Sequence, residues 1–392
     1  MLGTECAGMI QAWDQSGGVT VGDRRRWAAA VTISVAVVAS ACGSEVTSGQ
    51  PTETTAVVPT EPEVSSKVSA NRARQLDDVE HWLYLIDVNL DADTVDQIVE
   101  SEHDLVVFDF IPSEQQNEDY PMGEVVDQLH GAEQPKLVLA YVDIGQAEDY
   151  RSYWETDWEI GDPEWIVAND PDGWEGNFPV AYWRDEWHDI WLDDGLVSQI
   201  VDAGFDGIYL DWVEAYSDDS VVQAASRDDV DPVSAMVDWV AALASTGRDG
   251  NPDFLVIGQN AAELAATNPR YRDVVDAVAQ EQVWFDGAAD NDPPGDCPLP
   301  ETDALIDTAA YENMLSDDCL RQYTEFPEST LHVSSEEYLV SLDAIRALGV
   351  PVLTVDYATT DENVSLVLDT SREHGFVPFV GTRFLDEFVP PR

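Results

Sequence analysis

Lysine is almost absent from this chain. Among 392 residues only Lys67 and Lys136 occur, and lysine and arginine together number 18. Aspartate and glutamate number 78, so the formal net charge is −60. A protein that binds phosphate groups needs a basic surface, which so few cations cannot supply. The charge therefore excludes nucleic acid as a partner and, more generally, polyanions.

The motifs of several enzyme classes are also missing. No G-x-S-x-G elbow of a serine hydrolase occurs, and the six histidines show no H-E-x-x-H or other close pairing for catalytic zinc. The acidic stretch 91–96 lacks the glycine and the terminal glutamate of an EF-hand, so we interpret it as the start of a helix. We therefore expect neither a metal ion nor a cofactor.

The apolar run at 27–38 is too short to span a membrane. It has about a dozen residues, whereas a transmembrane helix needs ~20. Arg24, Arg25 and Arg26 precede it and small residues ending in Ala41-Cys42 follow, which is the layout of a secretory signal. Residues 1–21 lack such features, and we interpret them as an overlong gene start.

The end of this signal, ASAC, resembles the lipobox of bacterial lipoproteins. The resemblance implies a diacylglycerol on Cys42, removal of 1–41, and a cell-surface protein anchored to the membrane. The alternative is an ordinary signal with an incidental cysteine, which would give a secreted protein. Residues 42–80 then comprise the lipidated cysteine and a tether, because 43–78 is rich in Thr, Ser, Pro and Glu without apolar periodicity.

Only four cysteines occur, and two of them remain for the exported domain. Cys6 lies in the removed segment and Cys42 is the lipid site, which leaves Cys297 and Cys319. Thiols oxidise outside the cell, so we predict a disulfide between these two. Two cysteines without a nearby histidine make a zinc site the weaker interpretation.

From residue 81 onward, short β-branched or aromatic runs alternate with helical patterns, as in βα units around a parallel sheet. Nine runs fit one (β/α)8 TIM barrel over 81–392 with one strand to spare, the spare being 178–183 or 376–380. No glycine-rich loop follows the first strand, which disfavours a doubly wound sheet. The predicted strands are 82–88, 104–110, 136–143, 178–183, 205–212, 254–260, 277–283, 350–356 and 376–380.

The sequence also indicates where several helices between these strands begin or end. Asp231-Pro232 supplies an N-cap and a proline at the first helical position. Ser334 and Glu337 form a capping-box pattern. A further helix is predicted near 361–374 and ends at a glycine.

Five predicted strands carry a carboxylate at or near their ends: Asp109, Asp143, Asp211, Glu281 and Asp356. The reacting groups of such barrels lie at the carboxyl ends of the strands. Each residue alone is either a site residue or a buried hydrogen-bonding group. Burial of several like charges in one place is costly without a use, so together they indicate a functional site.

Aromatic and amide side chains accompany these acids. Cleavage of a glycosidic bond needs one carboxylic acid to protonate the leaving oxygen and one carboxylate to attack or to activate water. Aromatic rings provide flat surfaces for sugars. The residues in question are Tyr141, Tyr182, Trp183, Gln259, Asn260, Trp284 and Tyr357.

Six ordered motifs identify a family. The region 81–392 resembles TIM-barrel glycoside hydrolases related to endo-α-1,4-polygalactosaminidase, glycoside hydrolase family 114. The resemblance implies a polysaccharide substrate, Asp211 as nucleophile and Glu281 as acid/base. The motifs are LVVFDF at 105–110, YVDIGQAEDYRSYW at 141–154, WEGNFPVAYW at 174–183, GFDGIYLDWVEAY at 204–216, IGQNAAEL at 257–264 and VLTVDYA at 352–358.

Two positions depart from the family pattern. Gln146 stands where relatives usually have a glutamate, and Glu214 replaces a shorter acid. Neither is one of the catalytic pair. The loss of a carboxylate at 146 leaves open a catalytically silent, surface-anchored sugar-binding lipoprotein.

The substrate that the resemblance implies is a partly deacetylated, cationic α-1,4-galactosamine polymer, cleaved internally with retention. An acidic cleft would attract such a polymer. Because the acidity is spread along the chain and arginine outnumbers lysine 16 to 2, we interpret it instead as a surface built for high salt. We expect a monomer in which the sugar is held by six residues: Asp109, Tyr141, Asp143, Tyr182, Asn260 and Asp356.

Overall fold

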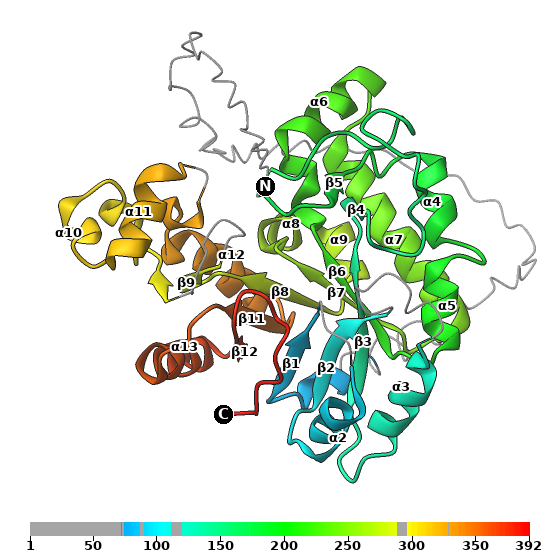
Figure 1. The fold of residues 1–392 in the computed structure, drawn as a ribbon, viewed down its shortest axis with the longest axis horizontal. Coiled ribbons are helices and arrows are strands. Elements are labelled where there is room, and N and C mark those ends of the chain that lie inside the picture. Colours follow the sequence, from blue (N-terminus) through cyan, green and yellow to red (C-terminus); the bar gives the residue numbers. More distant parts are fainter. Residues whose placement is uncertain are drawn as a thin grey trace, which may run out of the picture. The chain divides into compact units, whose positions relative to one another are not determined.

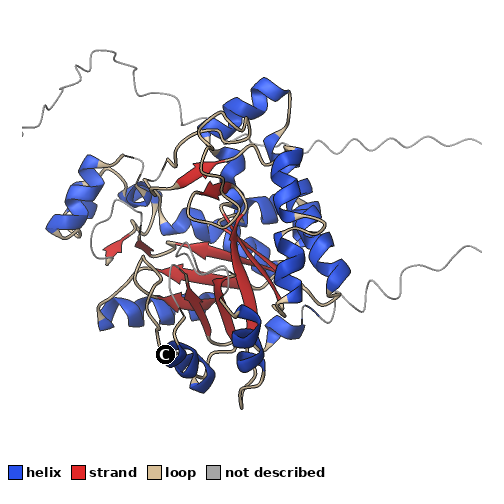
Figure 2. Cartoon of the chain, turned by 45° about the vertical axis from the view of Figure 1, so that its right-hand side comes forward, coloured by secondary structure: helices blue, strands red, loops and turns tan. Residues whose placement is uncertain are grey.

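The computed structural model describes most of the chain from residue 72 onward (Figures 1 and 2). The predicted signal, Cys42 and the tether up to residue 71 lie outside the described residues, so export and the lipid anchor stay predictions. Within the described part, no helix is both long and apolar enough to cross a membrane. The described residues are 72, 74–86, 90–110, 120–171, 173–287, 296–327 and 329–392.

Eight parallel strands form one sheet with the order β1-β2-β3-β6-β7-β8-β11-β12. The indole nitrogen of Trp82 on β1 donates to the carbonyl of Val377 on β12 at 3.0 Å, which brings the last strand beside the first. The sheet is the predicted (β/α)8 barrel. Its strands are β1 Trp82–Leu85, β2 Leu105–Asp109, β3 Leu137–Asp143, β6 Gly207–Asp211, β7 Leu255–Gln259, β8 Ala277–Glu281, β11 Val352–Asp356 and β12 Val377–Val380.

The spare strand of the sequence prediction is 178–183. It contributes β5, Asn177–Pro179, which pairs antiparallel with β4, Gln146–Glu148, beyond the carboxyl end of β3. A second small ribbon pairs β9, Phe285–Asp286, with β10, Cys297–Pro298. Both ribbons follow barrel strands at the end where the predicted site lies (Figure 1).

Helices surround the strands, as the blue ribbons around the red sheet in Figure 2 show. The α-helices are α2 Ala92–Glu100, α3 Met122–His130, α4 Asp185–Trp191, α5 Leu196–Asp202, α6 Asp219–Asp228, α7 Pro232–Gly250, α8 Ala262–Thr267, α9 Pro269–Val274, α10 Ala309–Glu312, α11 Asp317–Glu325, α12 Ser335–Ala347 and α13 Asp361–His374. Three short 3-10 helices are η1 Val213–Ser217, η2 Asp303–Leu305 and η3 Thr330–His332.

Two side chains cap helices as the sequence predicts, whereas Asp231 stands at the N-cap position of α7 without a side-chain hydrogen bond to a helix amide. Asp91 accepts a hydrogen bond from the Thr94 amide at 2.8 Å, so the acidic stretch does begin a helix. Ser334 accepts from the Glu337 amide at 3.2 Å. Helix α13 ends at Gly375, whose φ of 73° is the left-handed conformation that glycine favours.

Aromatic rings fill the barrel interior beneath the strand ends. Tyr84 and Tyr209 lie with ring centroids 5.0 Å apart, and Trp82 lies 6.0 Å from Tyr209. All three are almost fully buried. Such dense packing holds the strands in a fixed register, and the hydroxyl of Tyr209 also donates to the side-chain oxygen of Gln259 at the end of β7.

The predicted disulfide is present. Cys297 of β10 and Cys319 of α11 are bonded, with their Cα atoms 5.4 Å apart. Tyr311, Tyr323 and Leu331 are buried around them in a small separate core. The disulfide therefore braces the segment between β8 and β11, which contributes Gly287 and Thr330 to the wall of the main cavity.

Candidate active site

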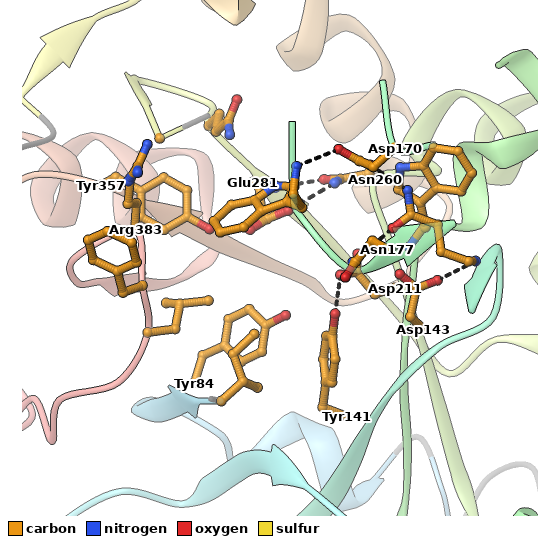
Figure 3. A pocket seen from close by; sticks show the side chains of 18 of the residues that line it. Tyr84, Tyr141, Asp143, Asp170, Asn177, Asp211, Asn260, Glu281, Tyr357 and Arg383 are labelled. Atoms are coloured by element: carbon orange, nitrogen blue, oxygen red, sulfur yellow. Dashed lines mark hydrogen bonds between the residues drawn. The ribbon is translucent and has the colours of Figure 1, made fainter. Parts of the chain in front are cut away.

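Asp211 and Glu281 end two strands of the barrel, and one amide group joins them. Gln259 ends the strand between them and its Nε2 donates to Asp211 Oδ1 at 2.6 Å and to Glu281 Oε2 at 2.7 Å. These two carboxylate oxygens can be no farther apart than the sum of the two distances, about 5.3 Å. The residues predicted as a catalytic pair therefore face each other (Figure 3).

The carboxylate of Asp211 is surrounded by donors. Besides Gln259, the hydroxyl of Tyr141 donates to Oδ2 at 2.6 Å and the amide of Trp212 donates to Oδ1 at 2.7 Å. Burial raises the pKa of Asp211, and these three hydrogen bonds oppose the rise because they stabilise the ionised form. The environment thus favours a charged, oriented carboxylate more than burial alone would.

Glu281 is held by residues that end or follow the two strands next to β8, namely β7 and β11. The side-chain nitrogen of Asn260 donates to Glu281 Oε2 at 3.0 Å, and the hydroxyl of Tyr357, which follows β11, donates to Oε1. Asn260 also accepts the backbone amide of Glu281 through its Oδ1 at 3.0 Å. Two amides and a phenol therefore fix the orientation of this carboxyl group.

Left-handed backbone follows each of the three central strands. Trp212, Asn260 and Gln282 come directly after β6, β7 and β8 and have φ values of 52°, 57° and 57°. Non-glycine residues adopt this conformation rarely, and they gather where surrounding structure enforces it, often at active sites. The sharp turns end the strands at the point where Asp211, Gln259 and Glu281 meet.

A cavity of about 720 Å³ opens above this pair. That volume lies within the ~300–1,000 Å³ of typical ligand sites. The strand-end residues form its floor, and its walls come from the segment around β4 and β5 and from the chain after β12. Its acidic lining residues are Asp143, Asp170, Glu175, Asp211, Glu214 and Glu281.

Glu214 brings a third carboxyl group close to the pair. It lies in η1, directly after β6, and within the described residues its buried Oε2 has no hydrogen-bond partner. Burial raises the pKa of Glu214 well above its ordinary value, and the charges of Asp211 and Glu281 raise it further. This raised pKa favours the protonated form of Glu214, which can donate a hydrogen bond into the cavity.

We expect Glu214→Gln to stabilise the protein increasingly as the pH rises above about 4.3, the pKa of an unperturbed glutamate. Above that pH the unfolded chain loses the Glu214 proton while the folded chain keeps it, so wild type loses stability relative to the variant. The difference should grow by at most about 1.4 kcal/mol per pH unit.

Urea unfolding between pH 4 and pH 8 measures this difference. Glu373→Gln, at an exposed position of α13, is the matched control. A difference between wild type and Glu214→Gln that stays constant with pH would show that Glu214 ionises equally in both states.

Of the six residues predicted to hold the sugar, three line the cavity: Tyr141, Asp143 and Asn260. Asp143 is nearly fully buried, and its Oδ1 accepts the amides of Gly145 and Gln146 at 3.0 and 2.7 Å. It therefore shapes the turn between β3 and β4. Burial, together with the charge of Asp211, raises its pKa well above the ordinary value.

The structure places the other three, Asp109, Tyr182 and Asp356, outside the lining of this cavity. Asp109 forms an ion pair with Arg151 at 2.8 Å. The hydroxyl of Tyr182 donates to the Pro232 carbonyl at 2.8 Å. Asp356 accepts the amides that follow β8, at 2.6 and 3.0 Å. Each of these three side chains therefore bonds to another part of the protein.

A buried ion-pair cluster lies next to Tyr141, and no pattern in the sequence predicts it. Arg151 bonds Asp109 Oδ1 at 2.8 Å and Glu148 Oε2 at 2.9 Å, and its guanidinium carbon is 5.9 Å from the centroid of the Tyr141 ring. The cluster thus supports the tyrosine that donates to Asp211. The hydrogen bonds of Gln259 and Tyr357 to the pair likewise follow from no local pattern, although both residues lie at predicted strand ends.

No set of three or more His, Cys, Asp or Glu side chains in the described part of the chain is arranged to hold a metal ion. The site consists instead of two facing carboxyls, the amides and phenols that orient them, and a third carboxyl group with a raised pKa. Such a set is suited to proton transfer and nucleophilic attack at an acetal carbon.

Solved structures share the fold. The glycoside hydrolase domain of PelA from Pseudomonas aeruginosa matches with a TM-score of 0.52 at 16% identity, over 79% of this chain and 97% of that domain. Ega3 of Aspergillus fumigatus, in complex with galactosamine, matches with a TM-score of 0.51 at 14% identity, over 80% of this chain and 95% of that one. At these identities the likeness establishes the barrel alone.

Sequence comparisons find relatives of higher identity. An uncharacterized protein of Deinococcus radiodurans is 31% identical over 289 residues, which cover 74% of this chain and 76% of the relative. A protein of Methanocaldococcus jannaschii is 28% identical over 319 residues, 78% of this chain and 77% of the relative. The model of glycoside-hydrolase family GH114 matches residues 65–391. The chain therefore belongs to glycoside-hydrolase family GH114.

Proposed function

We propose that this glycoside hydrolase cleaves within a polysaccharide of α-1,4-linked galactosamine units, with Asp211 as the nucleophile and Glu281 as the acid/base. The observation that carries the proposal is the shared amide of Gln259, which holds the two carboxyls face to face at the floor of the cavity. A two-carboxylate reaction at a glycosidic bond needs such a pair.

In the first step the ionised Asp211 attacks the anomeric carbon while Glu281 gives its proton to the leaving oxygen. The glycosidic C–O bond breaks, and an ester forms between the sugar and Asp211. In the second step Glu281 takes a proton from a water molecule, whose oxygen attacks the same carbon and releases Asp211. Both carboxyl groups return to their starting states, and the net reaction is hydrolysis.

The short separation supports retention of configuration. Retaining enzymes place their carboxyls about 5–5.5 Å apart, whereas inverting enzymes leave about 6.5–9.5 Å for a water molecule. The facing oxygens of Asp211 and Glu281 can be at most about 5.3 Å apart, which favours the covalent route.

The charge of the cavity supports a cationic sugar. Six acidic residues line it and Arg383 is the one cation among its described lining residues. A galactosamine unit with a free amine carries a positive charge, and an acidic cavity raises its local concentration. That Ega3 was solved in complex with galactosamine agrees with this choice of sugar.

The sugar-binding alternative receives no support from the position of Glu281. One sign of that interpretation would be a Glu281 that points away from Asp211, whereas both side chains contact the same nitrogen of Gln259. Gln146, whose identity had raised the alternative, is bonded within the wall of the cavity rather than to the pair.

We expect the purified enzyme to release reducing ends from partly deacetylated α-1,4-galactosaminoglycan, and the first product to have the α configuration because two displacements restore it. Reducing-end release from a panel of polysaccharides, at low and high salt, identifies the substrate class. Proton NMR during the first minutes distinguishes the α from the β anomer. An initial β product would overturn the nucleophilic role of Asp211, and release from a different polymer alone would overturn the galactosamine assignment.

A further inference from the structure

Two large aromatic side chains stand exposed at the mouth of the cavity. Trp174 is 39% exposed and Phe384 is 46% exposed, although both line the cavity. The guanidinium carbon of Arg383 lies 5.9 Å from the ring centroid of Trp174 and 4.7 Å from that of Phe384. One cation thus contacts two rings from segments about 210 residues apart in the chain.

The Trp174 side of this mouth is firmly attached to the barrel. Asp170 accepts the backbone amide of Trp174 at 2.8 Å and the side-chain amide of Gln146 at 2.6 Å. Gln146 in turn accepts from the Asn177 side chain at 3.1 Å. A glutamate at 146 would present a carboxylate to Asp170 and lose this donor, so the departure from the family pattern holds the Trp174 segment in place.

The Phe384 side is fixed as well. Leu385, the next residue, is buried, and its carbonyl accepts the amide of Ile86, directly after β1, at 2.8 Å. Both aromatic rings are therefore presented by anchored backbone, so little ordering is needed when a ligand arrives.

We propose that Trp174, Arg383 and Phe384 form a sugar-binding subsite at the cavity entrance, which takes an N-acetylated unit of the polymer. The proposal rests on the function proposed above and adds a second recognition element to it. The flat apolar face of a sugar ring packs against exposed aromatic rings. An arginine donates to the carbonyl oxygen of an acetamido group, whereas it repels an ammonium group.

The entrance and the floor therefore select different units of one chain. The floor, where the proposed reaction uses an ionised Asp211, attracts the deacetylated, cationic unit. The entrance, with Arg383, favours a neutral acetylated one. A strongly anionic unit such as a uronic acid is disfavoured, because the acidic lining of the cavity repels it.

The test compares Trp174→Ala and Phe384→Ala with wild type on galactosamine oligomers of increasing length. Phe326→Ala is the matched control, since Phe326 is 38% exposed and does not line the cavity. We expect the ratio of kcat/KM on long oligomers to that on the shortest cleaved oligomer to fall about tenfold in both variants, mainly through KM. The control should keep the wild-type ratio.

Arg383→Gln tests the acetyl preference. On oligomers of equal length, partly N-acetylated or fully deacetylated, wild type is expected to favour the former, and the variant should lose that preference at least about fivefold. An unchanged preference would overturn the acetyl assignment. Equal losses at every length in the alanine variants would overturn the subsite.

A direct binding measurement separates this inference from the proposed function. Asp211→Asn, alone and combined with Trp174→Ala, is titrated calorimetrically with a partly N-acetylated oligomer. Weaker binding in the double variant supports the subsite even if wild type hydrolyses nothing, in which case the proposed function alone fails. Identical binding by both proteins overturns the subsite.

Discussion

Glu281→Gln is expected to slow cleavage of the natural polymer by about 10²–10⁴-fold, the usual contribution of a general acid. The side chain keeps its size, and its amide can still bond Gln259 and Tyr357, but it has no proton to give. An aryl glycoside whose leaving group needs no protonation should therefore form the ester with Asp211 at nearly the wild-type rate. Azide added to this variant should restore turnover and give a glycosyl azide of retained configuration.

Asp211→Asn is the contrasting variant. It removes the nucleophile, so it should abolish cleavage of the polymer and of the aryl glycoside alike, and azide should not restore a retained product. Circular dichroism and thermal unfolding check that both variants fold. If Glu281→Gln loses the aryl glycoside as completely as the polymer, Glu281 is not the acid and the assignment of the two roles is wrong.

Arg151→Met is expected to lower the free energy of unfolding by about 3–5 kcal/mol, the range found when a buried ion pair loses one partner. Asp109 and Glu148 are only 2% and 3% exposed, and Arg151 bonds both. Removal of the guanidinium leaves two carboxylates close together without their cation. Guanidinium chloride unfolding measures the loss.

Arg321→Met is the control for this prediction, because Arg321 forms a 2.9 Å ion pair with Asp318 in which both side chains are more than half exposed. Such surface pairs contribute about 0–1 kcal/mol. Adding Asp109→Asn and Glu148→Gln to Arg151→Met should recover part of the stability, since the buried charges are then gone. A loss as small as that of the control would mean that water reaches the cluster.

The sequence predicted the barrel well because its strands are buried on both faces and read as short apolar runs. It left open whether 178–183 or 376–380 was the spare strand, because the buried aromatic and β-branched residues of 178–183 resemble those of a barrel strand. Helix ends such as Ser334 were predictable because a cap is a local interaction of a few residues.

The site was only partly predictable. A carboxylate at a strand end can face the cavity, as Asp211 does, or turn to neighbouring backbone, as Asp356 does, and the pattern along the strand is the same for both. The hydrogen-bond partner determines which of the two a carboxylate does. The partner of Asp356 is a backbone amide that follows β8, about 70 residues away in the chain. The contact between Trp174 and Arg383 could not be predicted, because no local sequence pattern indicates that two distant loops lie together.

The shared amide of Gln259 has a consequence for how the charge moves during the proposed reaction. At the start Asp211 is ionised and Glu281 is neutral; in the ester intermediate Asp211 is neutral and Glu281 is ionised. Because Gln259 donates to both, one negative charge always lies next to the same nitrogen. Both hydrogen bonds persist, and the stronger one is always to the carboxyl that is ionised. The dipoles around the pair stay where folding placed them, so the barrier contains little reorganisation of the protein.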